Sequence, residues 1–157
     1  MTRSQPDVLL AEDDPADAEL IIASLGGDDA MRRVHVARDG KEALDFVFGR
    51  GAFAERASAA PPRLVLLDIK LPKVDGLEVL RQLKRDARTA AIPVVVLTSS
   101  NLVRDVALVY ELGANSFVQK PVDFGEFRDA IRLAGTYWLS INEPPPLSAS
   151  PPSTPER

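Results

Sequence analysis

Two short runs of consecutive apolar residues place the strongest constraint on how this chain folds. The runs are "LVLL" (64–67) and "PVVVL" (93–97). A strand with one face in water alternates apolar and polar residues, whereas an unbroken apolar run fits a strand that is covered on both faces. Strands of that kind are typical of parallel sheets with helices packed on each side. The two runs therefore predict an α/β fold.

The rest of the chain continues this pattern, because short β-rich runs alternate with longer helical periodicities. A strictly alternating order of this kind predicts a doubly wound parallel sheet with helices on both faces. Asp14-Pro15 is a typical helix start, Gly113 a typical helix end, and Asp123 with Glu126 another helix start. The candidate strands are 7–11, 32–37, 63–68, 92–98 and 115–120, and the candidate helices are 15–25, 39–49, 75–86, 101–112 and 123 to about 141.

Composition narrows the class of protein. The 157 residues are 45% hydrophobic and suit one domain with its own core. A net charge of -4 argues against a nucleic-acid partner, because binding phosphates needs a basic surface. Cysteine is absent, which removes disulfides and thiolate sites. The sequence has no apolar stretch of membrane-spanning length and no signal peptide, so we expect a cytoplasmic protein with no membrane partner.

Proline usage predicts where the domain ends. Six of the thirteen prolines lie within "PPPLSASPPSTPER" (144–157), a segment with almost nothing apolar to bury. We therefore expect a folded domain over residues 6–142 and a Pro-rich, disordered tail over 143–157. That tail is too short for a further domain, so the domain is expected to stand alone and to act through its surface.

The ends of the predicted strands carry the residues that are best suited to bind an ion or to react. Glu12 and Asp13 follow the first strand, Asp68 the third, Thr98 the fourth and Lys120 the fifth. Ligand sites of doubly wound sheets lie at the carboxyl ends of the strands. Clustered carboxylates suit Mg²⁺, and a hydroxyl and an ammonium beside the cation suit a phosphoryl group. The set predicts a site in which a carboxylate accepts a phosphoryl group as an acyl phosphate.

Four stretches together identify a family resemblance: "LLAEDD" (9–14), "LVLLDIKLPKVDGLEVL" (64–80), "IPVVVLTSS" (92–100) and "FVQKPVD" (117–123). In this order and spacing, the chain resembles the receiver domain of two-component response regulators over residues 6–140. The resemblance implies a flavodoxin-like (CheY-like) fold, in which a five-stranded parallel sheet has the strand order 2-1-3-4-5. It also implies a signalling switch, which catalyses only its own phosphorylation and dephosphorylation and is not an enzyme acting on an external substrate.

The resemblance assigns roles around the phosphoacceptor. Asp68 matches the aspartate that accepts the phosphoryl group. Glu12 and Asp13 match the acidic pair that, together with Asp68, holds Mg²⁺, with Mn²⁺ as an alternative. The backbone carbonyl of Lys70 matches the family's main-chain metal ligand. Asp14, the third acid of "EDD", is better explained as the helix cap.

Further roles follow from the fourth and fifth strands. Thr98 and Lys120 match the hydroxyl and the amine that contact the phosphoryl oxygens. For Thr98 the alternative is a helix-capping hydroxyl, with Ser99 or Ser100 in the phosphoryl role. Phe117 matches the switch aromatic that relays the signal with Thr98, and half-buried packing explains it equally well.

The phosphoryl donor is expected to be another protein, because the sequence has neither a P-loop nor G-x-G-x-x-G. The resemblance implies a sensor histidine kinase or a phosphotransfer protein. The C-terminal stretch "TYWLSINEPPP" (136–146) resembles the response regulators of phytochrome-type histidine kinases. We therefore expect a bacterial phytochrome as the partner kinase. His35, the only histidine, is expected to be a packing or surface residue.

Two helices are unusually apolar for a domain surface, namely 101–112 and the last helix from 123. This predicts a homodimer formed by these two helices and the strand between them. The alternative is that Tyr137 and Trp138 pack on their own domain. The residues assigned to the dimer surface are Val106, Tyr110, Phe127, Tyr137 and Trp138.

Two other functional classes remain as alternatives. A Mg²⁺-dependent phosphatase also forms an aspartyl phosphate, but the familiar pattern has a second acid two residues after the nucleophile, where this chain has Lys70. A receiver-like scaffold that is never phosphorylated usually lacks part of the acidic set or the lysine. This chain keeps both, which favours the phosphorylated switch.

Overall fold

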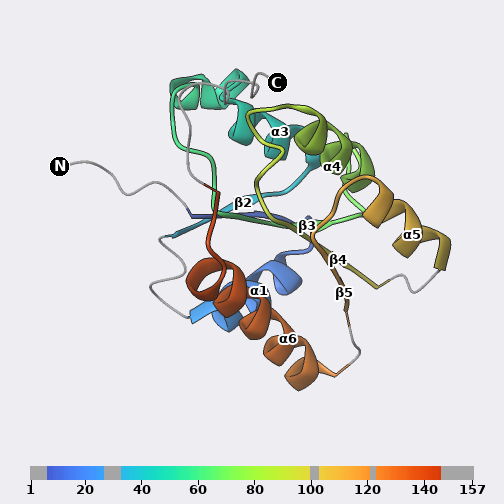
Figure 1. Ribbon diagram of the computed structural model, residues 1–157. Helices are drawn as coiled ribbons and strands as arrows, with labels where there is room; N and C mark the ends of the chain where they lie inside the picture. Colours follow the sequence, from blue (N-terminus) through green and yellow to red (C-terminus); the bar gives the residue numbers. More distant parts are fainter. Residues whose placement is uncertain (1–6, 27–32, 100–102, 121–122, 146–157) are drawn as a thin grey trace, which may run out of the picture.

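The computed structural model describes residues 7–26, 33–99, 103–120 and 123–145. The described chain forms one sheet of five parallel strands in the order β2-β1-β3-β4-β5 (Figure 1). This confirms the predicted doubly wound fold and its strand order. The strands are β1 (Val8–Ala11), β2 (Val34–Ala37), β3 (Leu64–Asp68), β4 (Val94–Thr98) and β5 (Ser116–Gln119).

Helices cover both faces of the sheet. Two of them, α1 and α6, pack together on one face, and α3, α4 and α5 lie on the other (Figure 1). A 3-10 helix, η1, follows α3, and a short π-helix, η2, follows α6. Among the described residues, no helix has the length and apolar content that a bilayer span requires. The bounds are α1 (Pro15–Gly26), α3 (Gly40–Phe48), η1 (Gly51–Arg56), α4 (Gly76–Arg85), α5 (Val103–Glu111), α6 (Phe124–Thr136) and η2 (Tyr137–Ile141).

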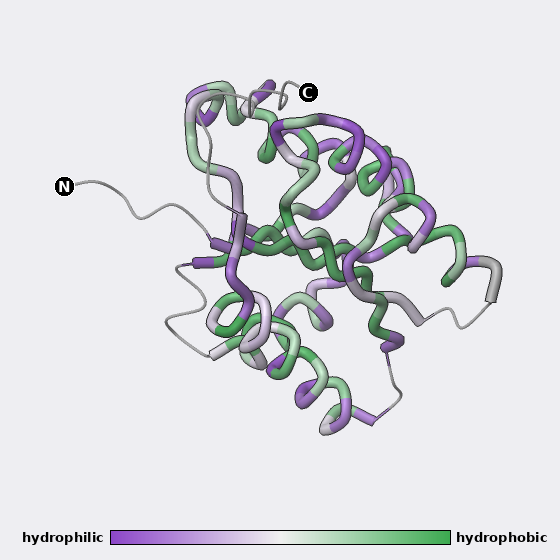
Figure 2. The backbone as a smooth tube through the Cα atoms, viewed as in Figure 1, coloured by the Kyte–Doolittle hydropathy of each residue, from purple (hydrophilic) through white to green (hydrophobic). Residues whose placement is uncertain are grey.

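The apolar runs supply two cores, one on each face of the sheet, and this accounts for their lack of alternation. In β3, Leu64 and Leu66 join the cluster beneath α1 and α6, whereas Val65 and Leu67 join the cluster beneath α3, α4 and α5. β4 divides its residues between the two clusters in the same way. Figure 2 shows the strands as the most continuously hydrophobic part of the chain. Burial on both faces holds the strand ends rigidly in place.

Helix boundaries follow their capping residues. The Asp14 carboxylate accepts hydrogen bonds from the backbone N–H groups of Ala16 and Asp17 at 2.8 and 3.2 Å, which confirms Asp14 as the cap of α1. Asp123 caps α6 by accepting from the N–H of Glu126 at 2.9 Å. Gly113, just beyond α5, has φ = 104°, a backbone conformation that glycine adopts without strain.

The last helix changes from an α-helix to a π-helix near its end. We expected one helix to about residue 141, but α6 ends at Thr136 and η2 continues as a π-helix. The N–H of Asn142 donates to the carbonyl of Tyr137 at 2.6 Å and closes this wider turn. The guanidinium of Arg63 donates to the Leu139 carbonyl at 2.7 Å and holds η2 against the rest of the domain.

The described chain extends a few residues past the predicted domain end. Pro144 and Pro145 help to line a cavity of about 240 Å³ together with Pro61 and Pro62, which precede β3. The predicted tail over 143–157 therefore begins in contact with the domain. Residues 146–157 lie outside the described residues, so their disorder stays a prediction.

Candidate functional site

Four strand ends bring side chains to one edge of the sheet. Glu12 directly follows β1, Asp68 ends β3, Thr98 ends β4 and Lys120 directly follows β5. The strands run parallel, so their carboxyl ends lie together. Thr98 is 1% exposed. Glu12 and Asp68 are 1% and 7% exposed, which is unusual for carboxylates and indicates that partners surround them.

An acidic cluster forms the first part of the site. Glu12, Asp13 and Asp68 each place one carboxylate oxygen within 4.8 Å of the other two. Asp13 is exposed and the other two are buried, so the cluster is open on one side. Oxygen ligands at this separation fit a hard divalent cation such as Mg²⁺ or Mn²⁺. The residues present therefore fit the metal that the family resemblance implies.

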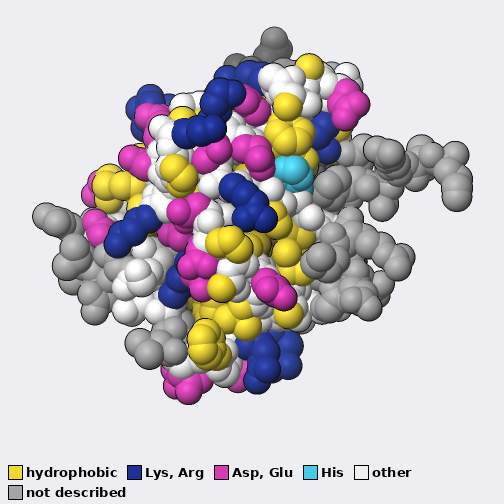
Figure 3. All heavy atoms as spheres, turned by 180° about the vertical axis from the view of Figure 1, so that it is seen from behind, with side chains coloured by type: hydrophobic (Ala, Val, Ile, Leu, Met, Phe, Trp, Pro, Cys, Tyr) yellow, Lys and Arg dark blue, Asp and Glu magenta, His cyan; other side chains and the backbone are white. Residues whose placement is uncertain are grey.

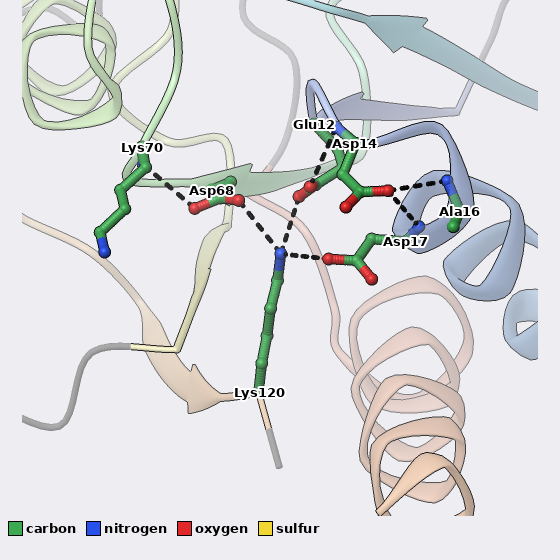
Figure 4. Close-up of polar contacts among 7 residues, drawn as sticks. All are labelled: Glu12, Asp14, Ala16, Asp17, Asp68, Lys70 and Lys120. Atoms are coloured by element: carbon green, nitrogen blue, oxygen red, sulfur yellow. Dashed lines mark hydrogen bonds and ion pairs between the residues drawn. The ribbon is translucent and has the colours of Figure 1, made fainter. Parts of the chain in front are cut away.

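The ammonium of Lys120 forms the second part. Its Nζ lies 3.0 Å from Oε2 of Glu12, 3.1 Å from Oδ2 of Asp68 and 3.1 Å from Oδ2 of Asp17 (Figure 4). The backbone N–H of Lys120 also donates to the carbonyl of Thr98 at 2.8 Å, which fixes the start of this side chain beside β4. A lysine that is 14% exposed thus lies among three carboxylates.

These contacts change the acidity of both partners. Burial raises the pKa of Glu12 to about 8, and the Asp68 carboxylate adds to this effect while Lys120 opposes it. Burial acts in the opposite sense on Lys120, but the carboxylates of Asp68 and Glu12 outweigh it and raise the pKa of the lysine. The lysine is therefore firmly charged at neutral pH, whereas Glu12 tends to hold a proton when no cation is bound.

The two oxygens of Asp68 have different partners. Oδ2 faces Lys120, and Oδ1 accepts a hydrogen bond from the backbone N–H of Lys70 at 3.1 Å. The side chain of Lys70 is exposed and points away from the carboxylate (Figure 4). The backbone of Lys70 thus belongs to the site, and the role of its carbonyl as a metal ligand stays a prediction.

Thr98 and Phe117 lie on the neighbouring strands β4 and β5. Thr98 is buried at the end of β4, and Phe117 is half-buried in β5 against the core cluster on the α3, α4 and α5 side. Ser99 is exposed, and Ser100 lies outside the described residues. Phosphoryl contact by Thr98 and switching by Phe117 stay predictions.

Two residues of the site escaped the sequence analysis. Asp17, in the first turn of α1, binds Lys120. Gly76, at the start of α4, packs so closely on the end of β3 that a Cβ there would lie 2.2 Å from the carbonyl oxygen of Asp68. The "DG" pair after Asp68 was a visible signal for Gly76. Nothing in the sequence distinguished Asp17 from an ordinary acid near a helix start.

His35 is a packing residue, as predicted. Its ring stacks on Phe46 with a centroid distance of 4.1 Å and meets Phe53 edge-on at 5.2 Å. Its Nε2 lies 3.5 Å from Oε2 of Glu42 without forming a hydrogen bond within the described part of the chain. Burial lowers the pKa of His35 below its ordinary value, although Glu42 opposes the shift.

The residues assigned to a dimer surface separate into two groups. Tyr110 and Tyr137 are 50% and 46% exposed, and Val106 is half-buried. Phe127, in contrast, is 3% exposed, because it packs in the core cluster beneath α1 and α6. Its assignment to a contact surface was therefore wrong. Trp138 is partly buried against the same cluster, as the alternative interpretation held.

Comparison with known proteins agrees with this fold and this arrangement of residues. The model of one family, the response regulator receiver domain, matches residues 8–132. The chain therefore belongs to the response regulator receiver family. It is 41% identical to the probable methanogenesis regulatory protein FilR2 of Methanothrix harundinacea over 138 residues, 88% of this chain and 86% of that relative. It is 35% identical to the response regulator Rcp1 of Synechocystis sp. over 132 residues, 84% of this chain and 88% of Rcp1.

Solved structures give the same result. The phosphorylated cyanobacterial phytochrome response regulator RcpA superposes with a TM-score of 0.82 at 34% identity, covering 91% of this chain and all 100% of RcpA. The Mn²⁺-bound form of Rcp1 superposes with a TM-score of 0.79 at 32% identity, covering 90% and 100%. The bacteriophytochrome response regulator AtBRR has a TM-score of 0.68 at 46% identity, covering 89% and 99%. The chain is thus a receiver domain similar to phytochrome response regulators.

Proposed function

We propose that Asp68 accepts a phosphoryl group from the phosphohistidine of a sensor histidine kinase or a phosphotransfer protein. The observation that carries this proposal is the buried Asp68 carboxylate, held between the ammonium of Lys120 and the backbone N–H of Lys70. A carboxylate oxygen of Asp68 attacks phosphorus and forms the new O–P bond. The N–P bond of the phosphohistidine breaks, and its electron pair returns to the partner's imidazole.

Glu12, Asp13 and Asp68 would hold Mg²⁺, together with the backbone carbonyl of Lys70. The carboxylate spacing supports this assignment, as does the similarity to Rcp1, which has been solved with Mn²⁺. When bound, the cation supplies positive charge beside the phosphoryl oxygens. Lys120 supplies a second positive charge from the β5 side, and Thr98 a hydroxyl from β4. Both groups orient the phosphoryl group and offset its charge.

The test of phosphorylation is direct. The protein is incubated with acetyl phosphate and Mg²⁺, and its intact mass is measured. We expect the mass of one added phosphoryl group in the wild type and none in Asp68→Asn. Asp129→Asn is a matched control, because Asp129 is exposed on the surface of α6, where it pairs with Arg132. An unmodified wild type, or equal labelling of Asp68→Asn, would exclude Asp68 as the acceptor.

Phosphorylation would act through the surface formed by α5, β5 and α6, which we propose as the surface of a homodimer. Several large apolar side chains of α5, α6 and η2 are exposed, as a contact surface requires. They are Leu108, Tyr110, Leu133, Tyr137 and Ile141. On the face shown in Figure 3, Lys and Arg side chains are interspersed with acidic and apolar ones, which favours a protein partner over a nucleic acid.

Sedimentation velocity tests the homodimer at micromolar concentration, with and without beryllofluoride as a phosphoryl analogue. We expect a dimer in at least one state and a monomer for Tyr110→Glu/Tyr137→Glu. Monomer alone in both states of the wild type would exclude the dimer. Phe127 is not a suitable site for this test, because its replacement would disturb the core.

A phytochrome-type kinase is the proposed phosphoryl donor. The support is the similarity to RcpA and AtBRR, which are described as phytochrome and bacteriophytochrome response regulators. Phosphotransfer from a purified bacterial phytochrome kinase, compared at short times with transfer from unrelated histidine kinases, tests the assignment. Equal rates from all donors would remove the specific link and leave the receiver function intact.

A further inference from the structure

The ammonium of Lys120 has one partner outside the proposed metal site. Two of its contacts, Glu12 and Asp68, are residues that would hold the cation. The third, Asp17, lies on the first turn of α1 and does not belong to the carboxylate cluster of the metal site. The Asp17 contact is as short as the Asp68 contact, at 3.1 Å each. α1 and the end of β5, distant in sequence, are thus joined through one lysine.

A simpler explanation for Asp17 is that acids are generally favoured near the start of a helix. In a capping box, however, the carboxylate in the position of Asp17 would turn back to the N–H of the cap residue, Asp14. That N–H instead faces Oε1 of Glu12 at 3.4 Å. The Asp17 carboxylate is directed into the site, toward the lysine (Figure 4). Its position therefore reflects the ion pair and not the cap.

Two of the three carboxylates in the proposed metal site, Glu12 and Asp68, already accept hydrogen bonds. Asp68 uses Oδ1 for the N–H of Lys70 and Oδ2 for Lys120. Glu12 likewise uses Oε2 for Lys120. The ammonium takes one lone-pair direction on Oε2 of Glu12 and on Oδ2 of Asp68, and its positive charge opposes the approach of a cation to these oxygens. A lysine held by Glu12 and Asp68 alone would therefore compete with the cation for these two carboxylates.

We propose that Asp17 is the positioning residue of Lys120. It holds the ammonium from the α1 side, so that Lys120 remains in the site while Glu12 and Asp68 release it to bind a cation and a phosphoryl group. This inference rests on the proposed function of Asp68. Asp17 touches neither the cation nor the phosphoryl group, and it acts only through Lys120.

The first test measures the contact without any ligand. The amines of the protein are labelled competitively with an acylating reagent, and the labelling of Lys120 is compared with that of the exposed Lys41 by peptide mass spectrometry. We expect Asp17→Asn to increase the relative labelling of Lys120 by about twofold to fivefold, the range for a partly exposed ion pair. Glu19→Gln, which removes the same charge from an exposed position on α1, leaves the ratio unchanged. An unchanged ratio in Asp17→Asn overturns the inference.

The second test is a double-mutant cycle on Mg²⁺ affinity, measured by titration calorimetry. Asp17→Asn is expected to weaken Mg²⁺ binding by about twofold to fivefold, because Lys120 then competes more strongly for Glu12 and Asp68. Asp17→Glu restores most of the affinity. In a Lys120→Gln background, Asp17→Asn has little further effect. An equal loss in both backgrounds would mean that Asp17 acts as a remote charge, and it would refute the role assigned here.

Phosphorylation separates this inference from the function on which it rests. In the wild type, acetyl phosphate modifies Asp68, and in Asp17→Asn the same modification is slower at subsaturating Mg²⁺. Absence of modification in the wild type would refute the proposed function, while the amine labelling would still report the contact between Asp17 and Lys120. Normal phosphorylation, labelling and Mg²⁺ affinity in Asp17→Asn would refute the inference alone.

Discussion

At the scale of single residues, the charge of the site depends on the ionisation of Glu12, whose pKa is raised toward neutral pH. This carboxyl group is almost fully buried next to Asp68, and burial raises its pKa to about 8. A cation requires the ionised carboxylate, so a proton must leave when the cation binds. Lys120 opposes this shift in the pKa of Glu12 but does not outweigh the burial.

We therefore predict that Mg²⁺ binding releases a proton at pH 7 and that its apparent affinity rises with pH up to about 8. Below this pKa the rise approaches a factor of about ten per pH unit, since one proton competes with the cation. Calorimetric titrations in two buffers of different ionisation enthalpy give the number of protons released. The Glu12→Gln variant should bind Mg²⁺ more weakly and without this pH dependence. No proton release from the wild type at pH 7 would contradict the raised pKa.

His35 gives a second pH effect, unrelated to the metal. Burial lowers its pKa in the folded protein below the ordinary 6.5, so the unfolded chain takes up a proton first as the pH falls. The contribution to stability is fully present above pH 6.5 and is lost as the pH falls from there toward the folded pKa. The charged groups that face this ring are Glu42 on α3, which opposes the shift, and Arg56 on η1, which adds to it.

We predict that His35→Phe, which keeps the stack on Phe46, reduces the loss of stability between pH 7.5 and 5. Urea unfolding at the two pH values measures this loss in the wild type and the variant. The difference between them is attributable to His35, because the other titrating groups are common to both proteins. An identical pH dependence in the two proteins would show that His35 titrates alike in the folded and unfolded states.

At the scale of elements, α1 carries more of the site than its sequence suggested. Its cap, Asp14, accepts from two backbone N–H groups, and one of these belongs to Asp17, the partner of Lys120. The cap therefore fixes the turn that directs Asp17 into the site. In the run "EDD", the first two acids belong to the carboxylate cluster with Asp68, and the third begins a helix.

Replacement of Asp14 tests its role as the cap of α1. We predict that Asp14→Ala lowers the free energy of unfolding by about 1 kcal/mol, the usual cost of losing an N-cap. Asp14→Ser, which retains a capping oxygen, should recover most of that loss. Chemical denaturation without metal measures both variants. A loss of equal size in Asp14→Ser would point to the charge of Asp14 and not to its hydrogen bonds.

The order of the elements was predictable because a strand buried on both faces needs an unbroken apolar run, and β3 and β4 have one each. The cluster at the strand ends followed from the same rule, since parallel strands end at one edge. The contact of Asp17 with Lys120 was not predictable, because the two residues are 103 positions apart and only the packing of α1 brings them together. Phe127 was misplaced because periodicity shows which residues share a helix face, but not whether that face meets the sheet or a second chain.

At the scale of the whole molecule, the two apolar cores stabilise the sheet, and the site lies outside them. The apolar clusters on either face of the sheet hold the strands in register, and the site lies beyond the strand ends with an open, exposed Asp13. Changes at Asp13 should therefore leave the cores intact. Any cation that binds the folded site, and not the unfolded chain, adds its binding free energy to the stability of the entire domain.

We predict that Mg²⁺ raises the melting temperature of the wild type and that Asp13→Ala largely removes this increase. At a concentration ten times the dissociation constant, the gain is about 1.4 kcal/mol, or roughly 3 °C for a domain of this size. Differential scanning calorimetry over a range of Mg²⁺ concentrations, at constant ionic strength, measures the effect. Without Mg²⁺, Asp13→Ala should melt at or slightly above the wild-type temperature, because it relieves repulsion within the acidic cluster. A melting temperature that is independent of Mg²⁺ in the wild type would contradict the metal assignment, whatever the variant does.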